Sequence, residues 1–216
     1  MVANLDVKSF FPSTDINAVL QALLRLGIPK DPAGLLAVLM TCPDEKGIKA
    51  LPQGAPTSPY IANHVLSPVD QRFATFCKGR GLGYTRYIDD IAISGDRDFR
   101  QFKGTFVQFI RDAGYEVALN KIVFCGRDRP QIVTGLTVND KLRPVLSFVR
   151  ELAMLIKNCY WPDGPGLEVM AAAEGLRVQE LKERIVGRIQ HVRRFDPKGA
   201  RRLTALKFKR TRPRLH

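Results

Sequence analysis

Residues 83–94 read GYTRYIDDIAIS and combine two strand-like runs with a pair of carboxylates between them. Residues 83–87 and 91–94 are rich in aromatic and β-branched side chains, which favour β-strands. We therefore predict a β-hairpin that carries Asp89 and Asp90 at its tip. A solvated acidic turn without chemical function is the alternative interpretation, because turns commonly contain aspartate.

A third carboxylate follows a predicted strand near the N-terminus. Residues 2–7 are mostly apolar and predict a short buried strand with Asp6 near its end. An antiparallel sheet can bring Asp6 next to the hairpin tip. Buried like charges raise one another's pKa unless a cation intervenes, and carboxylate oxygens suit Mg²⁺. Two such ions about 3.5–4 Å apart activate an attacking hydroxyl and stabilise a leaving phosphate, so the three aspartates predict a phosphoryl-transfer site.

The remaining patterns predict an α+β fold. Residues 42–56 are polar, contain Gly and Pro, and are predicted to form a loop. From residue 175 onward the chain is helical in pattern and strongly basic, which suggests a domain boundary near residue 145. The apolar spacing predicts helices over 16–24, 31–40, 59–73 and 99–113, and short strands at 115–117, 122–124 and 131–138.

The composition favours a polyanionic partner. The chain has 34 Lys and Arg against 21 Asp and Glu, which gives a net charge of +13. Such a balance is typical of nucleic-acid-binding proteins. The four cysteines are widely spaced and predict neither a zinc site nor a disulfide framework. With no signal-like start and no apolar run near the roughly 18 residues of a membrane span, we expect a cytoplasmic protein without membrane contact.

Three stretches, in this order along the chain, resemble the catalytic motifs of reverse transcriptases. Residues 4–12 (NLDVKSFFP) are similar to motif A, residues 53–59 (QGAPTSP) to motif B, and residues 87–90 (YIDD) to motif C. The resemblance implies a polymerase palm over residues 1–145, an antiparallel sheet with helices on one face, followed by a basic helical thumb over residues 146–216. It also implies RNA-directed DNA synthesis with dNTPs on an RNA template and a DNA primer.

The resemblance assigns the metal site and the leaving-group chemistry. Asp6, Asp89 and Asp90 match the metal-binding triad, and the Val7 carbonyl is a further expected ligand. Two Mg²⁺ ions are the implied cofactors, with Mn²⁺ as a substitute. Lys121 resembles the motif D lysine that protonates the departing pyrophosphate. A surface lysine on a strand edge is the alternative for that residue.

The resemblance also assigns nucleotide and nucleic-acid contacts. Phe11 occupies the place of the bulky side chain that blocks a ribose 2′-hydroxyl, with plain core packing as the alternative. The residues implied beside the incoming nucleotide are Gln53, Gly54 and Tyr87. The pair expected to start the following helix and to contact nucleic acid is Ser58 and Pro59, and an ordinary helix start is the alternative.

Residues 131–139 (QIVTGLTVN) resemble the Val-Thr-Gly block of retron reverse transcriptases. They predict a small hairpin beneath the primer backbone, and a purely structural hairpin is the alternative. Downstream, apolar residues at helical spacing are interleaved with basic ones that are expected to bind nucleic acid, including a structured non-coding RNA, unless they only form a solvated face. These basic residues are Lys182, Arg184, Arg188, Arg193, Arg194, Arg201, Arg202, Lys207, Lys209, Arg210, Arg212 and Arg214.

Only five residues precede Asp6, where reverse transcriptases have a fingers region. An incomplete sequence, a split enzyme whose fingers come from another chain, and a relic that only binds nucleic acid are the three explanations. Apolar surface left without fingers predicts a partner chain or self-association. An intron-encoded or defence-associated reverse transcriptase, and a palm without turnover that binds nucleic acid, are the alternatives to the retron type.

Overall fold

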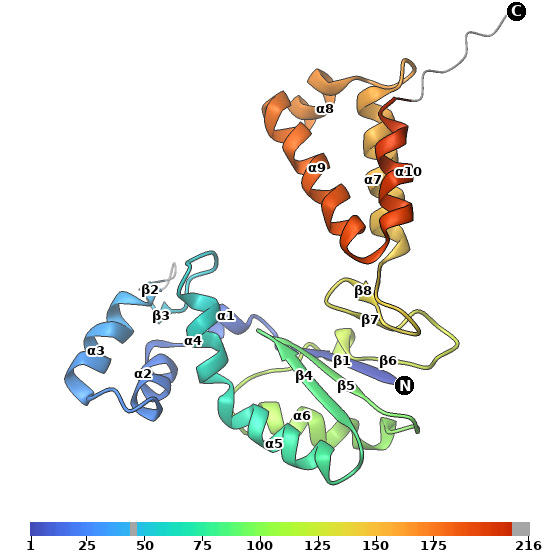
Figure 1. The fold of residues 1–216 in the computed structure, drawn as a ribbon. Coiled ribbons are helices and arrows are strands. Elements are labelled where there is room, and N and C mark those ends of the chain that lie inside the picture. Colours follow the sequence, from blue (N-terminus) through green and yellow to red (C-terminus); the bar gives the residue numbers. More distant parts are fainter. Residues whose placement is uncertain (44–46, 209–216) are drawn as a thin grey trace, which may run out of the picture. The chain divides into compact units, whose positions relative to one another are not determined.

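The computed structural model describes residues 1–43 and 47–208, and the chain divides into two compact units, Met1–Arg129 and Pro130–His216 (Figure 1). The division precedes the boundary near residue 145 that the composition suggested. Strand β9 (Arg143–Pro144) contacts helix α9 (Val178–Phe195), so the small sheet that contains β9 belongs with the helices after it.

The first unit is built on a four-stranded antiparallel sheet in the order β4-β5-β1-β6. The central strand β1 pairs with β5 on one side and with β6 on the other. Chain order therefore differs from spatial order, and the N-terminal strand lies in the middle of the sheet (Figure 1). The strands are β1 (Val2–Asp6), β4 (Gly83–Tyr87), β5 (Asp90–Ser94) and β6 (Val123–Cys125).

Two helices, α5 (Ser67–Lys78) and α6 (Lys103–Arg111), pack together, and α5 packs on β4. Their contact is an aromatic cluster around Phe73, which is fully buried. The Phe73 ring stacks on Tyr84 of β4 at 5.1 Å and meets Phe106 and Phe109 of α6 at 5.7 and 5.2 Å. The helices therefore cover the sheet face to which Tyr84 points.

The chain between β1 and α5 contains a short helix and a small sheet that were not predicted. Ser9 has a left-handed backbone (φ 48°), which lets the chain turn from β1 into the short helix α1 (Phe10–Ser13). The predicted loop over 42–56 contains a two-stranded sheet of β2 (Cys42–Pro43) and β3 (Lys49–Ala50). Residues 44–46 of that loop lie outside the described residues. The predicted helices over 16–24 and 31–40 are confirmed as α2 (Ile16–Arg25) and α3 (Lys30–Leu39).

The long helix predicted over 59–73 is wrong, because α4 (Ser58–Val65) ends at Leu66 and α5 begins at Ser67. Pro68 has no N–H to donate and its ring clashes with the preceding turn, so one continuous helix cannot form. The carbonyls of His64 and Val65, which lose helical partners at this break, accept hydrogen bonds from Arg25 at 3.1 and 3.4 Å.

The other predicted elements of this unit are present in shortened form. The 99–113 helix is the 3₁₀ turn η1 (Arg100–Phe102) followed by α6. Residues 115–117 form a single bridge, between Val117 and Val7, in place of the predicted strand. A second 3₁₀ turn, η2 (Leu119–Lys121), precedes β6.

The second unit has its own sheet and its own apolar core. Strands β7 (Ile132–Val133) and β8 (Leu136–Thr137) form the hairpin predicted over 131–138, and β9 adds a third strand. Thr134 and Gly135 both have positive φ in its turn. The helices of this unit are α7 (Leu146–Tyr160), α8 (Leu167–Ala173), α9 and α10 (Pro197–Leu206). Their shared core includes Leu152, Ile156, Leu181, Ile185 and Val192.

Within the described ranges, no helix combines the length and the apolar character that a bilayer crossing requires.

Candidate active site

The strand register places two of the three candidate aspartates side by side. Asp6 at the end of β1 is the cross-strand partner of Asp90 at the start of β5. Directly opposed residues of antiparallel strands direct their side chains to the same face. The neighbouring pair, Leu5 and Ile91, is buried in the core, so Asp6 and Asp90 lie on the opposite, open face of the sheet.

The third aspartate lies in the turn between β4 and β5. Tyr87 and Asp90 form the last pair of the hairpin, so Ile88 and Asp89 form a two-residue turn. Ile88 has φ 55°, an uncommon conformation for a β-branched residue. The Val7 amide donates a hydrogen bond to the Asp89 carbonyl at 3.4 Å, which links the turn to the end of β1.

The three carboxylates influence one another electrostatically. Burial raises the pKa of Asp89 above its ordinary value, and the negative charge of Asp6 raises it further. Burial also raises the pKa of Asp90, and the charges of Asp89 and Asp6 act in the same direction. A positive charge placed among them would favour the ionised forms and lower both pKa values.

Lys121 provides one such positive charge. Its Nζ lies 2.6 Å from Oδ2 of Asp6, and this hydrogen bond, together with the charge of Asp6, raises the pKa of Lys121. The residue belongs to η2 and its side chain is 64% exposed. It is therefore a surface lysine, as in the alternative considered for it, but it lies on a 3₁₀ turn and not on a strand edge.

The donor chemistry fits a hard divalent cation. Among the residues that the structure describes, no three His, Cys, Asp or Glu side chains are already arranged as metal ligands, and Asp6 faces Lys121. Carboxylate oxygens are nevertheless the ligands that Mg²⁺ prefers. Exposed side chains change rotamer rapidly, so Lys121 can leave Asp6 without a change in the fold.

A cavity of about 680 Å³ adjoins Asp6. Three basic side chains line it, those of Lys8, Arg111 and Lys121, and the lining also includes Glu116. Lys8 is paired with Glu116 at 2.9 Å, and Lys121 with Asp6. The cavity therefore offers cationic groups next to a carboxylate, an arrangement suited to an anionic group held beside a metal ion.

The residues predicted to contact the nucleotide lie in three places of the first unit. Phe11 is half-buried in α1, packs against the core, and meets Phe10 edge-on at 5.6 Å. Gln53 and Gly54 are exposed in the turn before α4, where Gly54 has φ 87°, a conformation that favours glycine. Tyr87 is 66% exposed on the same open face as Asp90.

Ser58, which was predicted to contact nucleic acid, makes an internal contact within the first unit. The residue is fully buried, and its hydroxyl donates a hydrogen bond to the Pro52 carbonyl at 2.7 Å. Ser58 therefore fixes the chain that carries Gln53 and Gly54 to the start of α4. Pro59 is exposed in the first turn of that helix.

The basic residues of the second unit divide into two groups. Arg184 is paired with Glu174, and the Arg188 guanidinium lies 6.0 Å from the Phe148 ring, so local partners engage both. Arg193, Arg194, Arg201 and Arg202 are exposed on α9 and α10. The predicted basic residues Lys209, Arg210, Arg212 and Arg214 lie outside the described residues.

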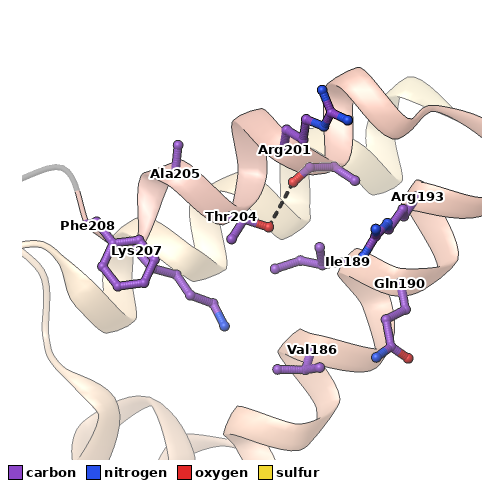
Figure 2. A pocket seen from close by; sticks show the side chains of 10 residues that line it. Val186, Ile189, Gln190, Arg193, Arg201, Thr204, Ala205, Lys207 and Phe208 are labelled. Carbon is purple, nitrogen blue, oxygen red and sulfur yellow. Dashed lines mark hydrogen bonds between the residues drawn. The ribbon is translucent and has the colours of Figure 1, made fainter.

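Two of the exposed arginines border a cavity of about 550 Å³ between α9 and α10 (Figure 2). Its lining includes the apolar residues Val186, Ile189 and Ala205. The basic side chains at its margin belong to Arg193, Arg201 and Lys207. The second unit thus presents a basic surface beside an apolar hollow.

Arg86 is the residue of this site that motif matching missed. It lies in β4 between Tyr84 and Tyr87, and its side chain points to the helix-covered face and is only 6% exposed. The alternation of the strand could have drawn attention to it, since Arg86 shares a face with the buried Tyr84 and a buried arginine needs partners.

An antiparallel sheet covered by helices on one face, with three aspartates at adjoining strand ends near its open face, defines a palm-type polymerase domain. A family model described as reverse transcriptase (RNA-dependent DNA polymerase) matches residues 1–160. The chain belongs to the reverse transcriptase family.

Its relatives include retron reverse transcriptases. The chain is 31% identical over 231 residues to the retron Mx65 reverse transcriptase of Myxococcus xanthus, which covers 99% of this chain and 50% of that protein. It is 31% identical over 142 residues to the retron Ec86 reverse transcriptase of Escherichia coli, covering 65% of this chain and 43% of that protein. The chain thus spans about half the length of these relatives.

A solved structure supports the fold. The telomerase of Candida albicans, determined with a fragment of telomeric RNA, matches with a TM-score of 0.50 over 98% of this chain and 40% of its own. At 12% sequence identity, this likeness concerns the fold alone.

Proposed function

We propose that this chain forms the palm and thumb of a retron-type reverse transcriptase, which adds dNTPs to a primer 3′ end on an RNA template. The observation that carries the proposal is the pairing of Asp6 with Asp90 beside the Asp89 turn. In this proposal the first unit is the palm and the second is the thumb. Family membership and the retron relatives support the assignment.

In the proposed chemistry, the contributing residues lie around the end of β1 and the turn that carries Asp89. Asp6, Asp89, Asp90 and the Val7 carbonyl would hold two Mg²⁺ ions, which activate the primer hydroxyl and neutralise charge on the transferred phosphate. Lys8 and Arg111 line the cavity beside Asp6 and would attract the triphosphate. The Lys121 ammonium lies beside Asp6 and would donate a proton to the departing pyrophosphate.

Primer extension tests this proposal. Polymerase that contains this chain, given an RNA template, a DNA primer, dNTPs and Mg²⁺, should extend the primer. Because the matched relatives are about twice as long, the assay should be run with the chain alone and with the chain supplemented by a fingers region. An intact polymerase that does not extend the primer would contradict the proposal.

A second candidate is a nucleic-acid-binding palm without turnover. The Asp6–Lys121 pair favours it, since an ammonium at 2.6 Å already neutralises one candidate metal ligand. The two candidates differ in metal uptake. Mn²⁺ binding that depends on Asp89 supports the polymerase, whereas salt-sensitive RNA binding without Mn²⁺ uptake supports the binding module.

Replacing Phe11 with alanine should increase the use of ribonucleotides relative to dNTPs by about tenfold or more, a discrimination that one steric contact can supply. The expected cause is the loss of a bulky side chain beside the sugar. Single-nucleotide incorporation with each substrate measures the ratio.

The neighbouring Phe10→Leu variant is the control for packing, because Phe10 is buried in the core and meets the Phe11 ring. It should lower stability without changing the ratio. If Phe11→Ala changes only stability, Phe11 is a packing residue.

Replacing Arg201 with glutamine should weaken RNA binding and reduce the salt dependence of log K by about one unit, as expected for one lost phosphate contact. Arg201 is exposed at the margin of the α9–α10 cavity. Fluorescence anisotropy with labelled RNA across a salt series measures both quantities. Arg184→Gln is the matched control, since Glu174 already engages Arg184, and its salt slope should hardly change. Equal slopes for both variants would contradict binding through Arg201.

A further inference from the structure

The side chain of Arg86 crosses from the catalytic hairpin to the helices beneath the sheet. Along β4, Tyr87 points to the open face, whereas Arg86 points to the helix-covered face and is 6% exposed. A guanidinium in such surroundings remains charged and must satisfy its donors with protein acceptors. Its partners therefore show what the buried charge holds in place.

Two helices supply most of these partners. Nε and Nη2 of Arg86 donate to the two carboxylate oxygens of Asp70 on α5 at 2.7 and 2.6 Å, a bidentate pair. On α4, Asn63 accepts through its Oδ1 at 3.1 Å and through its main-chain carbonyl at 3.4 Å. The Tyr84 hydroxyl also donates to Asp70, at 2.6 Å, which holds that carboxylate against β4.

The remaining partner of Arg86 is the main chain of the Ile88–Asp89 turn. Nη1 of Arg86 donates to the Ile88 carbonyl at 2.5 Å. This carbonyl belongs to the peptide unit that joins Ile88 to Asp89, and Ile88 has φ 55°. A β-branched residue keeps such a backbone only where its surroundings enforce it. The charged hydrogen bond from Arg86 contacts the peptide that follows this residue, and the other donors of the same guanidinium are held by two helices.

We propose that Arg86 is a positioning residue that holds the Ile88–Asp89 turn in the conformation in which Asp89 and Asp90 meet Asp6. Arg86 touches neither substrate nor metal and acts through the Ile88 carbonyl, with Asp70 and Asn63 as its anchors. The part of the inference that concerns metal rests on the proposed function. The part that concerns the conformation of the turn is independent of the proposed function.

The direction of the change in metal affinity after substitution of Arg86 distinguishes a positioning role from a purely electrostatic one. Removing a positive charge near three carboxylates should, by charge alone, strengthen the binding of a divalent cation. Losing the turn geometry should weaken it, as loss of a partner that orients a metal ligand typically costs about 10–100-fold in affinity. Arg86→Lys keeps the charge but loses the planar fork, so positioning predicts weaker binding there too.

Two measurements on the chain test the proposal, each with Arg86→Gln, Arg86→Lys and Asp70→Asn. Mn²⁺ titration followed by electron paramagnetic resonance should show affinity reduced by about tenfold or more in both Arg86 variants. Hydrogen exchange should be faster for amides in residues 87–90 and unchanged in the centre of β1. Arg86→Lys and Asp70→Asn keep the test available if Arg86→Gln does not fold.

Arg72→Gln is the matched control, since Arg72 lies on α5, the helix that carries Asp70, and pairs with Asp112 at 2.8 Å, but this pair is half exposed on the surface. It should change neither readout. Unchanged exchange in residues 87–90, exchange that rises uniformly across the first unit, or tighter Mn²⁺ binding in Arg86→Gln would overturn the proposal. If the unaltered chain takes up no Mn²⁺, the proposed function fails, while the exchange data still decide the role of Arg86.

Discussion

Replacing Asp89 with asparagine is expected to reduce primer extension by about 10³-fold or more. Carboxylates that hold a catalytic cation contribute several kcal/mol of transition-state stabilisation, and about 1.4 kcal/mol corresponds to a factor of ten. Asp89 lies in the turn beside Asp90 and is coupled electrostatically to Asp6, so the substitution should remove one proposed metal ligand and leave the fold intact. Steady-state extension on an RNA template measures the loss, and Mn²⁺ titration should show weaker binding in parallel.

Asp96→Asn is the matched control for Asp89→Asn. Asp96 follows β5 at the end away from Asp90, and its side chain is 95% exposed. The substitution removes the same charge without touching the site, so extension and Mn²⁺ affinity should stay within about twofold, the range of ordinary surface substitutions. Extension by Asp89→Asn at the rate of the Asp96 variant would remove the basis of the polymerase assignment.

Replacing Phe73 with alanine is expected to destabilise the first unit by about 3–5 kcal/mol, the usual cost of deleting a buried phenylalanine side chain. The ring is fully buried between Tyr84 of β4 and the α6 aromatics, so its removal leaves a cavity where α5 and α6 pack with the sheet. Urea unfolding followed by far-UV circular dichroism measures the change. The single tryptophan, Trp161, lies in the second unit, so its fluorescence reports that unit separately.

Phe208→Ala serves as the control, because Phe208 is 78% exposed and should cost no more than about 0.5 kcal/mol. The Phe73 variant should shift the circular dichroism transition and leave the Trp161 transition in place if each unit unfolds by itself. A Phe73 variant as stable as the Phe208 variant would mean that the aromatic cluster does not hold α5 on β4.

Local patterns predicted the parts of the site that depend on neighbouring residues. The strand preference of residues 83–87 and 91–94 and the turn chemistry between them correctly predicted the hairpin. The start of α2 is also set locally, since the Asp15 side chain accepts from the Ala18 amide at 2.8 Å. These features need only a few consecutive residues, and for that reason the sequence reveals them.

Predictions failed where a local signal was weak or where two signals competed. The apolar stripe through Ile61, Val65, Val69 and Phe73 continues across Leu66 and predicted one helix. The structure has two helices, because Pro68 breaks the chain of helical hydrogen bonds. Strands β2 and β3 have two residues each, too few for any periodicity to be visible. The burial of Ser58 depends on the carbonyl of Pro52, which the Ser-Pro pattern does not reveal.

The sequence alone determined which residues are candidates for the chemistry, their order along the chain, and the two-residue alternation that separates Asp90 from Ile91 across the sheet. The tertiary structure alone decided which distant groups meet them. Asp6 and Lys121 lie 115 positions apart and pair at 2.6 Å, and Arg86 joins the catalytic turn to Asp70 and Asn63 on two helices. Periodicity and turn chemistry act over a few residues, whereas these contacts arise only when the packing of helices against the sheet brings remote segments together.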